Sequence, residues 1–298
     1  MALASRFGGA EIVSADSRQV FRGMDIGTAK PSPADRAAAP HHGLDLVAPD
    51  EPFSAADFRR HALLALEGIA ARGGLALLVG GTGLYLRAVA RGLPLERSGS
   101  DPDVRRELEA RLASEGLADL AAELDRLDPG AAGSVDHANP RRVVRALERA
   151  IVTGSAAPPE PLGYGAPVLW LGLRVPDAVH REAIAERARR QFEAGLLDEA
   201  AGLGARFDEA LPAFSAMGYR EAFDVLAGRS DVATAVERTI ARSVAYARRQ
   251  RTWFRSEPGV TWLDPGEGGS VAAATDLMGR FLRAAAGSWS RADYPVAT

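Results

Sequence analysis

The sequence contains no cysteine and a single lysine, Lys30. Without thiols neither a disulfide framework nor a thiolate metal site can form, and the five histidines show no metal-ligand spacing. No apolar run approaches the roughly 20 residues that span a bilayer, and the first residues lack a basic start followed by a long apolar stretch. These absences predict a protein of the reducing cytoplasm that has no metal site of its own and does not enter a membrane.

A surplus of basic charge is also lacking, because the formal net charge at pH 7 is -3. Proteins that bind nucleic acids usually present a basic surface to the phosphates, so the total charge does not indicate such a partner and charge must be read locally. With 298 residues, of which 47% are hydrophobic, the chain can bury a full core. It should therefore form one large domain or two smaller ones.

Two short apolar segments predict a parallel sheet. Residues 11–14 and 75–79 read as buried strands, and a helix over residues 54–71 is predicted between them by Ser54 with Asp57 three residues later. Strand, helix and strand in this order indicate parallel pairing. Since ligands bind beyond the carboxyl ends of such strands, we expect Asp16 and Thr82 to converge there.

The middle of the chain changes character. Residues 101–153 are charged and helical in pattern, with helix starts at Asp101-Pro102 and Asn139-Pro140. A Pro/Gly-rich linker over residues 154–167 follows, after which strand character over residues 168–173 predicts that the sheet domain resumes. Two helices, over residues 177–194 and 231–255, come later. We predict an α/β core domain over residues 1–100 and 163–298, interrupted by a helical insertion and linker over residues 101–162.

Residues 14–31 carry the most specific motif, SADSRQVFRGMDIGTAKP, which resembles the signature of the tRNA dimethylallyltransferases, also called tRNA isopentenyltransferases. The resemblance continues through residues 55–58, 80–85, 139–148, 195–199, 217–220 and 248–253, and so spans nearly the whole chain. It implies a P-loop-type parallel sheet flanked by helices, with a helical insertion domain that binds the anticodon stem-loop of tRNA.

The resemblance also implies a reaction, the transfer of a dimethylallyl group from its diphosphate to N6 of the adenosine immediately 3′ of the anticodon. N6 is a poor nucleophile, so a carboxylate must accept its proton, and Asp16 is the candidate. Thr82 would lie near the reaction centre as a second catalytic residue. Arg187, with Mg²⁺ as cofactor, would bind the diphosphate, although Ala183 and Arg189 depart from the family pattern. As alternatives, Asp16 could cap the following turn and Thr82 a helix.

The residues that the resemblance assigns to tRNA lie in the first signature, beside Thr82 and in the insertion. They are Asp16, Ser17, Arg18, Gln19, Thr82, Arg105, Arg141, Arg142, Val143, Val144 and Arg145. The open alternative for the arginines is a solvated helix with an Arg145–Glu148 pair. A basic stripe on the late helix is equally open, because arginine is favoured throughout this composition; its members would be Arg238, Arg242, Arg248, Arg249, Arg251 and Arg255.

One expectation concerns the beginning of the chain. Family members open with a strand and a glycine-rich loop ending Gly-Lys-Ser/Thr, whereas residues 1–9 resemble the helix after that loop, so we expect the first strand and phosphate loop to be missing and activity to be impaired. Three alternatives therefore stay open: a tRNA-binding remnant, a small-molecule kinase with a P-loop sheet, and a transferase acting on free adenine nucleotides. The resemblance also implies a monomer.

Overall fold

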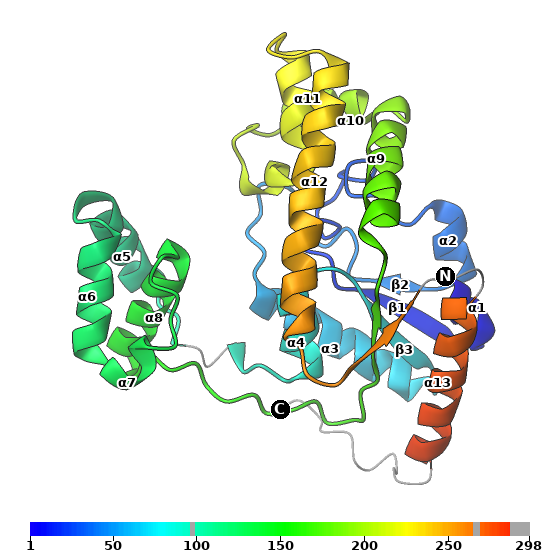
Figure 1. Ribbon diagram of the computed structural model, residues 1–298, viewed down its shortest axis with the longest axis horizontal. Helices are drawn as coiled ribbons and strands as arrows, with labels where there is room; N and C mark the ends of the chain where they lie inside the picture. Colours follow the sequence, from blue (N-terminus) through cyan, green and yellow to red (C-terminus); the bar gives the residue numbers. More distant parts are fainter. Residues whose placement is uncertain (96–98, 265–268, 287–298) are drawn as a thin grey trace. The chain divides into compact units, whose positions relative to one another are not determined.

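The structure is a computed structural model, which describes residues 1–95, 99–264 and 269–286 (Figure 1). The chain forms two compact units, one built from Met1–Ala90 and Tyr164–Thr298 and the other from Arg91–Gly163. We predicted the insertion over residues 101–162. The second unit begins earlier, directly after helix α4 (Gly83–Ala90).

The first unit contains a three-stranded parallel sheet. Its strands are β1 (Ala10–Ser14), β2 (His41–His42) and β3 (Leu75–Val79), in the order β2-β1-β3. The predicted strands β1 and β3 and their parallel pairing are confirmed, with Ser14 opposite Val79. Strand β2 is only two residues long and was not predicted. Because β1 and β3 end at the same level, the segments that follow them start side by side.

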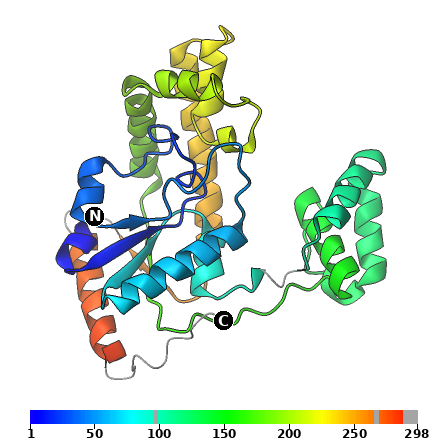
Figure 2. The ribbon, with the colours of Figure 1, turned by 180° about the vertical axis from the view of Figure 1, so that it is seen from behind.

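Helix α3 (Ala55–Ala71) connects β2 to β3 and packs against β1 and β3 (Figure 2). The predicted capping box is present, because Asp57 N donates to Ser54 Oγ and Ser54 N donates to Asp57 Oδ2. Phe58 and Ile69 are buried on the face that meets the sheet. The ring of Phe58 stacks on Tyr85 of α4 with the centroids 4.0 Å apart, which couples α3 to the segment after β3.

Strand β4 (Trp170–Leu173) does not rejoin the first sheet. It pairs in parallel with β5 (Val260–Leu263), with Trp170 opposite Val260, in a separate two-stranded sheet. The first unit resumes at Tyr164, as the predicted return of the sheet domain requires, but the strand itself forms a sheet of its own. The apolar pattern identified the strand, but it carries no information about the partner strand.

Helices make up most of the remainder of the first unit. Asp231 caps the longest of them, α12, by accepting a hydrogen bond from Thr234 N at 2.7 Å, and α9 and α12 lie side by side (Figure 1). These two confirm the predicted late helices. The bounds are α1 (Ala2–Arg6), α2 (Pro33–Ala38), α9 (Asp177–Glu193), α10 (Leu196–Gly204), the 3₁₀ helix η2 (Pro212–Ser215), α11 (Tyr219–Leu226), α12 (Val232–Arg255) and α13 (Gly269–Ala286).

The second unit is helical. It consists of α5 (Pro102–Ser114), α6 (Leu117–Leu127), α7 (Pro129–Ala132) and α8 (Pro140–Thr153). Asp101 and Asn139 cap α5 and α8, each followed by proline, as predicted. Its core is separate from that of the first unit and is formed by buried side chains including Leu108, Leu120, Leu124, Val143 and Leu147. In neither unit is any described helix both long and apolar enough to cross a membrane.

Candidate active site

The segments that follow β1 and β3 meet as predicted. Ser17 N donates to Thr82 Oγ1 at 3.0 Å, and the Thr82 hydroxyl donates to Ser17 Oγ at 3.3 Å. The backbone N–H of Thr82 donates to Ala15 O at 3.2 Å. Thr82 thus fixes the start of the signature loop, residues 16–30, against the end of β3.

Asp16 has a fixed and partly exposed carboxylate. Its Oδ1 accepts hydrogen bonds from Arg18 N at 2.8 Å and Gln19 N at 3.4 Å, which is the turn-capping role that the sequence left open. Both hydrogen bonds that Asp16 accepts from described residues go to Oδ1. The cap therefore orients the side chain while leaving Oδ2 for another partner.

Gln19 and Arg18 are occupied within the first unit. Gln19 accepts a hydrogen bond from Ser14 Oγ at 2.8 Å and donates to the carbonyls of Thr28 and Ala29, both at 3.2 Å. Arg18 donates to Pro212 O at 2.9 Å, and burial lowers the pKa of its guanidinium. Both ends of the Gln19 amide therefore already form hydrogen bonds within the loop, and the assignment of Gln19 to tRNA stays a prediction.

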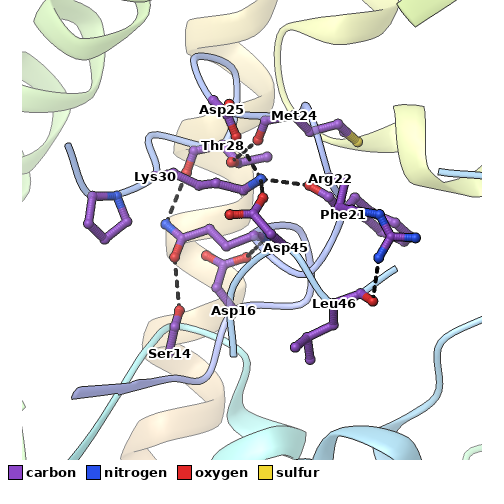
Figure 3. Close-up of polar contacts among 12 residues, drawn as sticks. Ser14, Asp16, Phe21, Arg22, Met24, Asp25, Thr28, Lys30, Asp45 and Leu46 are labelled. Atoms are coloured by element: carbon purple, nitrogen blue, oxygen red, sulfur yellow. Dashed lines mark hydrogen bonds and ion pairs between the residues drawn. The ribbon is translucent and has the colours of Figure 1, made fainter. Parts of the chain in front are cut away.

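The buried side chain of Lys30 binds other parts of the signature loop (Figure 3). Its side chain is only 1% exposed, and Nζ donates to Phe21 O at 2.6 Å, Asp25 Oδ1 at 2.7 Å and Asp45 Oδ1 at 2.5 Å. Burial raises the pKa of Asp45, but hydrogen bonds from Lys30 and Arg36 outweigh it and hold that pKa below its ordinary value. Every proton of this ammonium group is used to hold the loop.

Three helices hold the outer part of the same loop. Glu199 of α10 accepts hydrogen bonds from Asp25 N at 2.9 Å, Ile26 N at 2.7 Å and Gly27 N at 3.1 Å. The hydroxyl of the fully buried Tyr219 donates to Glu199 at 2.5 Å, and burial followed by this carboxylate raises the pKa of the phenol. From α9, Gln191 donates to Ile26 O at 2.8 Å. Motifs distant in sequence therefore position one loop.

The glycines around Thr82 allow close packing. A Cβ on Gly80 would lie 2.2 Å from Ala15 O, and a Cβ on Gly81 would lie 2.1 Å from Gln250 Nε2. Gln250 of α12 donates to Gly81 O at 2.9 Å. A side chain at position 80 would collide with the Ala15 backbone and push β3 away from β1, whereas one at position 81 would displace the Gln250 amide. Close backbone approach therefore requires the first glycine, and the second leaves room for Gln250.

Arg187 lies exposed on α9, one helical turn before Gln191. Residues four apart share a helix face, so Arg187 and Gln191 lie on the side of α9 that meets the signature loop. No hydrogen bond or ion pair joins the Arg187 guanidinium to a described residue. The neighbouring Arg189 is paired with Glu186 at 3.7 Å.

The four arginines of the second unit that the sequence assigned to tRNA divide into two groups. Arg105 donates to both carboxylate oxygens of the fully buried Glu148, at 2.9 and 3.1 Å, and Arg145 pairs with the same carboxylate. Burial raises the pKa of Glu148, but hydrogen bonds led by Arg105 bring it below its ordinary value. Arg141 and Arg142 are exposed at the start of α8. The Arg145–Glu148 pair left open by the sequence is therefore present.

Val143 and Val144 are 0% and 4% exposed and belong to the hydrophobic core of the second unit. Their assignment to tRNA stays a prediction, and it can concern only their backbone groups. Only the helical pattern, with Leu147 on the same face as Val143 and Val144, could have indicated this from the sequence.

Half of the arginines in the possible basic stripe on α12 form ion pairs within the first unit. Arg242 donates to Glu221 at 2.5 Å, Arg238 lies 3.7 Å from Asp224, and Arg251 pairs with Asp177. The remaining members are exposed: Arg248, Arg249 and Arg255. Half of the proposed stripe therefore serves internal ion pairs.

Several positioning residues had no role in the sequence prediction. Glu199 and Tyr219 lie in motifs noted for their resemblance, but their shared partner is a loop far away in sequence. Lys30 stood out only as the single lysine. Local patterns identified the segments, while long-range contacts define what these side chains do.

A parallel sheet with a fixed carboxylate and a hydroxyl at its carboxyl edge, together with a separate helical unit, defines an α/β protein with a candidate active site at that edge. The family model described as IPP transferase matches residues 19–257. A relative from Methylococcus capsulatus, named tRNA dimethylallyltransferase, is 46% identical over 91% of this chain and 89% of its own length. One of the same name from Roseiflexus sp. is 47% identical over 88% and 86%.

A solved structure agrees with the sequence comparison. The full-length tRNA isopentenylpyrophosphate transferase from Bacillus halodurans is 38% identical, with a TM-score of 0.70 over 96% of this chain and 92% of that chain. The chain belongs to the IPP transferase family. The predicted family and the α/β fold with flanking helices are thereby confirmed.

Proposed function

We propose that this protein transfers a dimethylallyl group from dimethylallyl diphosphate to N6 of the adenosine immediately 3′ of the anticodon in tRNA. The observation that carries the proposal is the Asp16 carboxylate, fixed through Oδ1 at the carboxyl edge of the sheet with Oδ2 available. Family membership supports the reaction class. We also propose that the protein acts in the cytoplasm, where it would meet its tRNA substrate, and that it acts as a monomer.

The proposed reaction needs a base because the N6 lone pair is delocalised into the adenine ring. As the bond between N6 and the first dimethylallyl carbon forms, the carbon–oxygen bond to the diphosphate breaks and diphosphate leaves with the electron pair. Asp16 accepts the proton from N6 through Oδ2. Thr82 positions this carboxylate by holding Ser17 at 3.0 Å and, in the proposal, also contacts the tRNA.

The leaving diphosphate needs positive charge, for which we propose Arg187 on the loop-facing side of α9. The proposed cofactor is Mg²⁺, which would neutralise charge on the diphosphate when bound. Among the described residues no three His, Asp or Glu side chains are grouped as a metal site. Such an ion would depend on substrate oxygens for most of its ligands, and we assign it no step.

The tRNA partner is assigned to the arginines of the second unit. We propose that the exposed Arg141 and Arg142 contact anticodon-loop phosphates directly. Arg105 and Arg145 contribute mainly through the start of α5 and the position of α8, since both hold the buried Glu148. Their partly exposed guanidinium groups would form the edge of the same surface.

The test is the variant Asp16→Asn in the complete protein, assayed by single-turnover transfer of labelled dimethylallyl to an anticodon stem-loop. Asparagine keeps Oδ1 as the acceptor for Arg18 N and Gln19 N, so the loop should keep its shape. It cannot accept the proton, and transfer should fall at least about 100-fold. Stem-loop affinity should stay within about threefold, since the variant removes only one contact of a larger tRNA surface.

A matched control is Asp198→Asn, which removes an exposed carboxylate next to Glu199. It should transfer at the wild-type rate. Wild-type turnover by Asp16→Asn would refute the assignment of Asp16 as the base. Transfer to free adenine nucleotides in preference to the stem-loop would refute the proposed substrate.

A further inference from the structure

One face of α12 follows the segment after β3. Tyr246, Gln250, Trp253 and Glu257 are spaced four, three and four residues apart, which places them on one side of the helix and its end. Gln250 contacts Gly81, as described above. A Cβ on Gly83 would lie 2.5 Å from the ring of Trp253. This face therefore runs closely alongside the Gly80–Gly83 turn.

The same alignment continues along α4. Arg87 donates to the buried Glu257 at 2.6 and 3.0 Å, and its guanidinium lies 4.5 Å from the ring centroid of Trp253. Three contacts therefore follow one another along both segments: Gly81 with Gln250, Gly83 with Trp253 and Arg87 with Glu257. Tyr246 lies on the same face one helical turn before Gln250 and so belongs to the end of this contact that includes Gly81 and the adjoining Thr82.

Tyr246 presents an unusual combination at this position. Burial, followed by the negative charge of Asp16, raises the pKa of its phenol, and hydrogen bonds with Gln250 and Thr82 lower that pKa only in part. Yet 37% of the residue is exposed, and it is among the large exposed side chains of the chain. Gln250, one turn further along the same face, donates to the carbonyl oxygen of Gly81, the residue before Thr82. The partly exposed Tyr246 side chain therefore forms an aromatic wall at the edge of the site.

Arg249 adds a cation to this wall. Its guanidinium carbon lies 5.6 Å from the centroid of the Tyr246 ring. Planar guanidinium groups and aromatic rings both stack on nucleobases, and a base that leaves its own stack needs such replacement contacts. No ion pair joins Arg249 to a described residue, so the group is not committed to an acid within the fold.

We infer that the Tyr246 ring, supported by Arg249, is a stacking surface for the adenine that receives the dimethylallyl group. This inference rests on the proposed function and names a contact beyond Asp16 and Thr82. Stacking would hold the extruded base with N6 turned toward Asp16. The hydroxyl of Tyr246 would serve only to orient the ring, through Thr82 and Gln250.

The experiment measures the affinity of wild-type protein and two variants for two anticodon stem-loops, one with adenine and one with an abasic site at the acceptor position. Tyr246→Leu keeps apolar bulk but removes the aromatic face, whereas Tyr246→Phe keeps the face. For the adenine stem-loop we expect Tyr246→Leu to bind about 5- to 150-fold more weakly. For the abasic stem-loop its affinity should match that of wild type within about threefold, because no base is left to stack.

Tyr246→Phe should stay within about threefold of wild type on both stem-loops. Equal weakening of both by Tyr246→Leu would show a structural role and overturn the inference, as would no weakening of either. The KM for dimethylallyl diphosphate should not change. If the wild-type protein transfers normally but Tyr246→Leu does not weaken binding of the adenine stem-loop more than that of the abasic one, only the stacking contact is overturned. Wild-type protein that fails to modify the adenine stem-loop overturns the proposed function together with this inference.

Discussion

Replacing Lys30 by methionine should loosen the signature loop more than any change on its surface. The ammonium group is 1% exposed and has three acceptors, and methionine keeps most of the volume while removing every donor. Breaking a buried ion pair costs ~3–5 kcal/mol. The lower end applies because Asp25 is 58% exposed and can be hydrated, and Asp45 keeps Arg36 at 2.9 Å.

We therefore expect the free energy of unfolding, measured by urea denaturation, to fall by about 3 kcal/mol, because the loss of the buried ion pairs is the largest effect of this substitution. For a chain of this size that corresponds to a melting point lower by roughly 6–12 °C. Transfer should also slow by about 10- to 100-fold, because Asp16 lies at the start of the loop and small displacements of a catalytic group are costly.

The control is Arg36→Met, which removes the second cation from Asp45 at a site where the arginine side chain is 37% exposed. Solvent screens this pair, so the loss should stay below about 1 kcal/mol. Lys30→Arg should not restore stability, because a planar guanidinium cannot reproduce three diverging donors. A Lys30→Met protein that melts within 2 °C of wild type, as roughly one kcal/mol or less would allow, would refute the reasoning.

Two further predictions concern the second unit. Replacing Arg141 and Arg142 together by alanine should weaken stem-loop binding without changing the melting point. The slope of the logarithm of the binding constant against the logarithm of salt concentration should become shallower by about two, one per phosphate contact. An unchanged slope would show that these arginines lie on a solvated helix face and do not contact phosphates. The second concerns Glu148, whose folded pKa lies below its ordinary 4.5. Its stabilisation is complete above pH 4.5 and is lost as pH falls through the lower folded value. The difference in unfolding free energy between wild type and Glu148→Gln should therefore shrink below that pH, and a constant difference down to pH 3 would contradict the assignment.

Local signals sufficed for much of the fold. The capping box at Ser54 and the starts at Asp101-Pro102 and Asn139-Pro140 each define a helix within a few residues of chain, and the structure confirms all three. The meeting of Asp16 and Thr82 was also predictable, because parallel strands bring their carboxyl ends to one edge. These features depend on neighbours in sequence or on a general rule of parallel sheets.

Long-range partners were not predictable from the same signals. Strand β4 pairs with β5, some 90 residues later in the chain, and nothing in an apolar hexapeptide specifies that choice. Glu199 accepts the N–H groups of Asp25 and Ile26, 174 and 173 residues away. An acid in a helical pattern is ordinarily assigned to solvent, so its role emerges only when the fold brings the loop to it.

The distribution of roles within the signature follows from what a fixed carboxylate requires. A base that must meet N6 needs its position defined to a fraction of an ångström, and a loop cannot supply this alone. Here Thr82 holds the start of the loop, Lys30 its interior and Glu199 its outer turn. Most of the motif therefore encodes support for Asp16 rather than substrate contact, so substitutions at its supporting positions should lower turnover more than they lower affinity for tRNA.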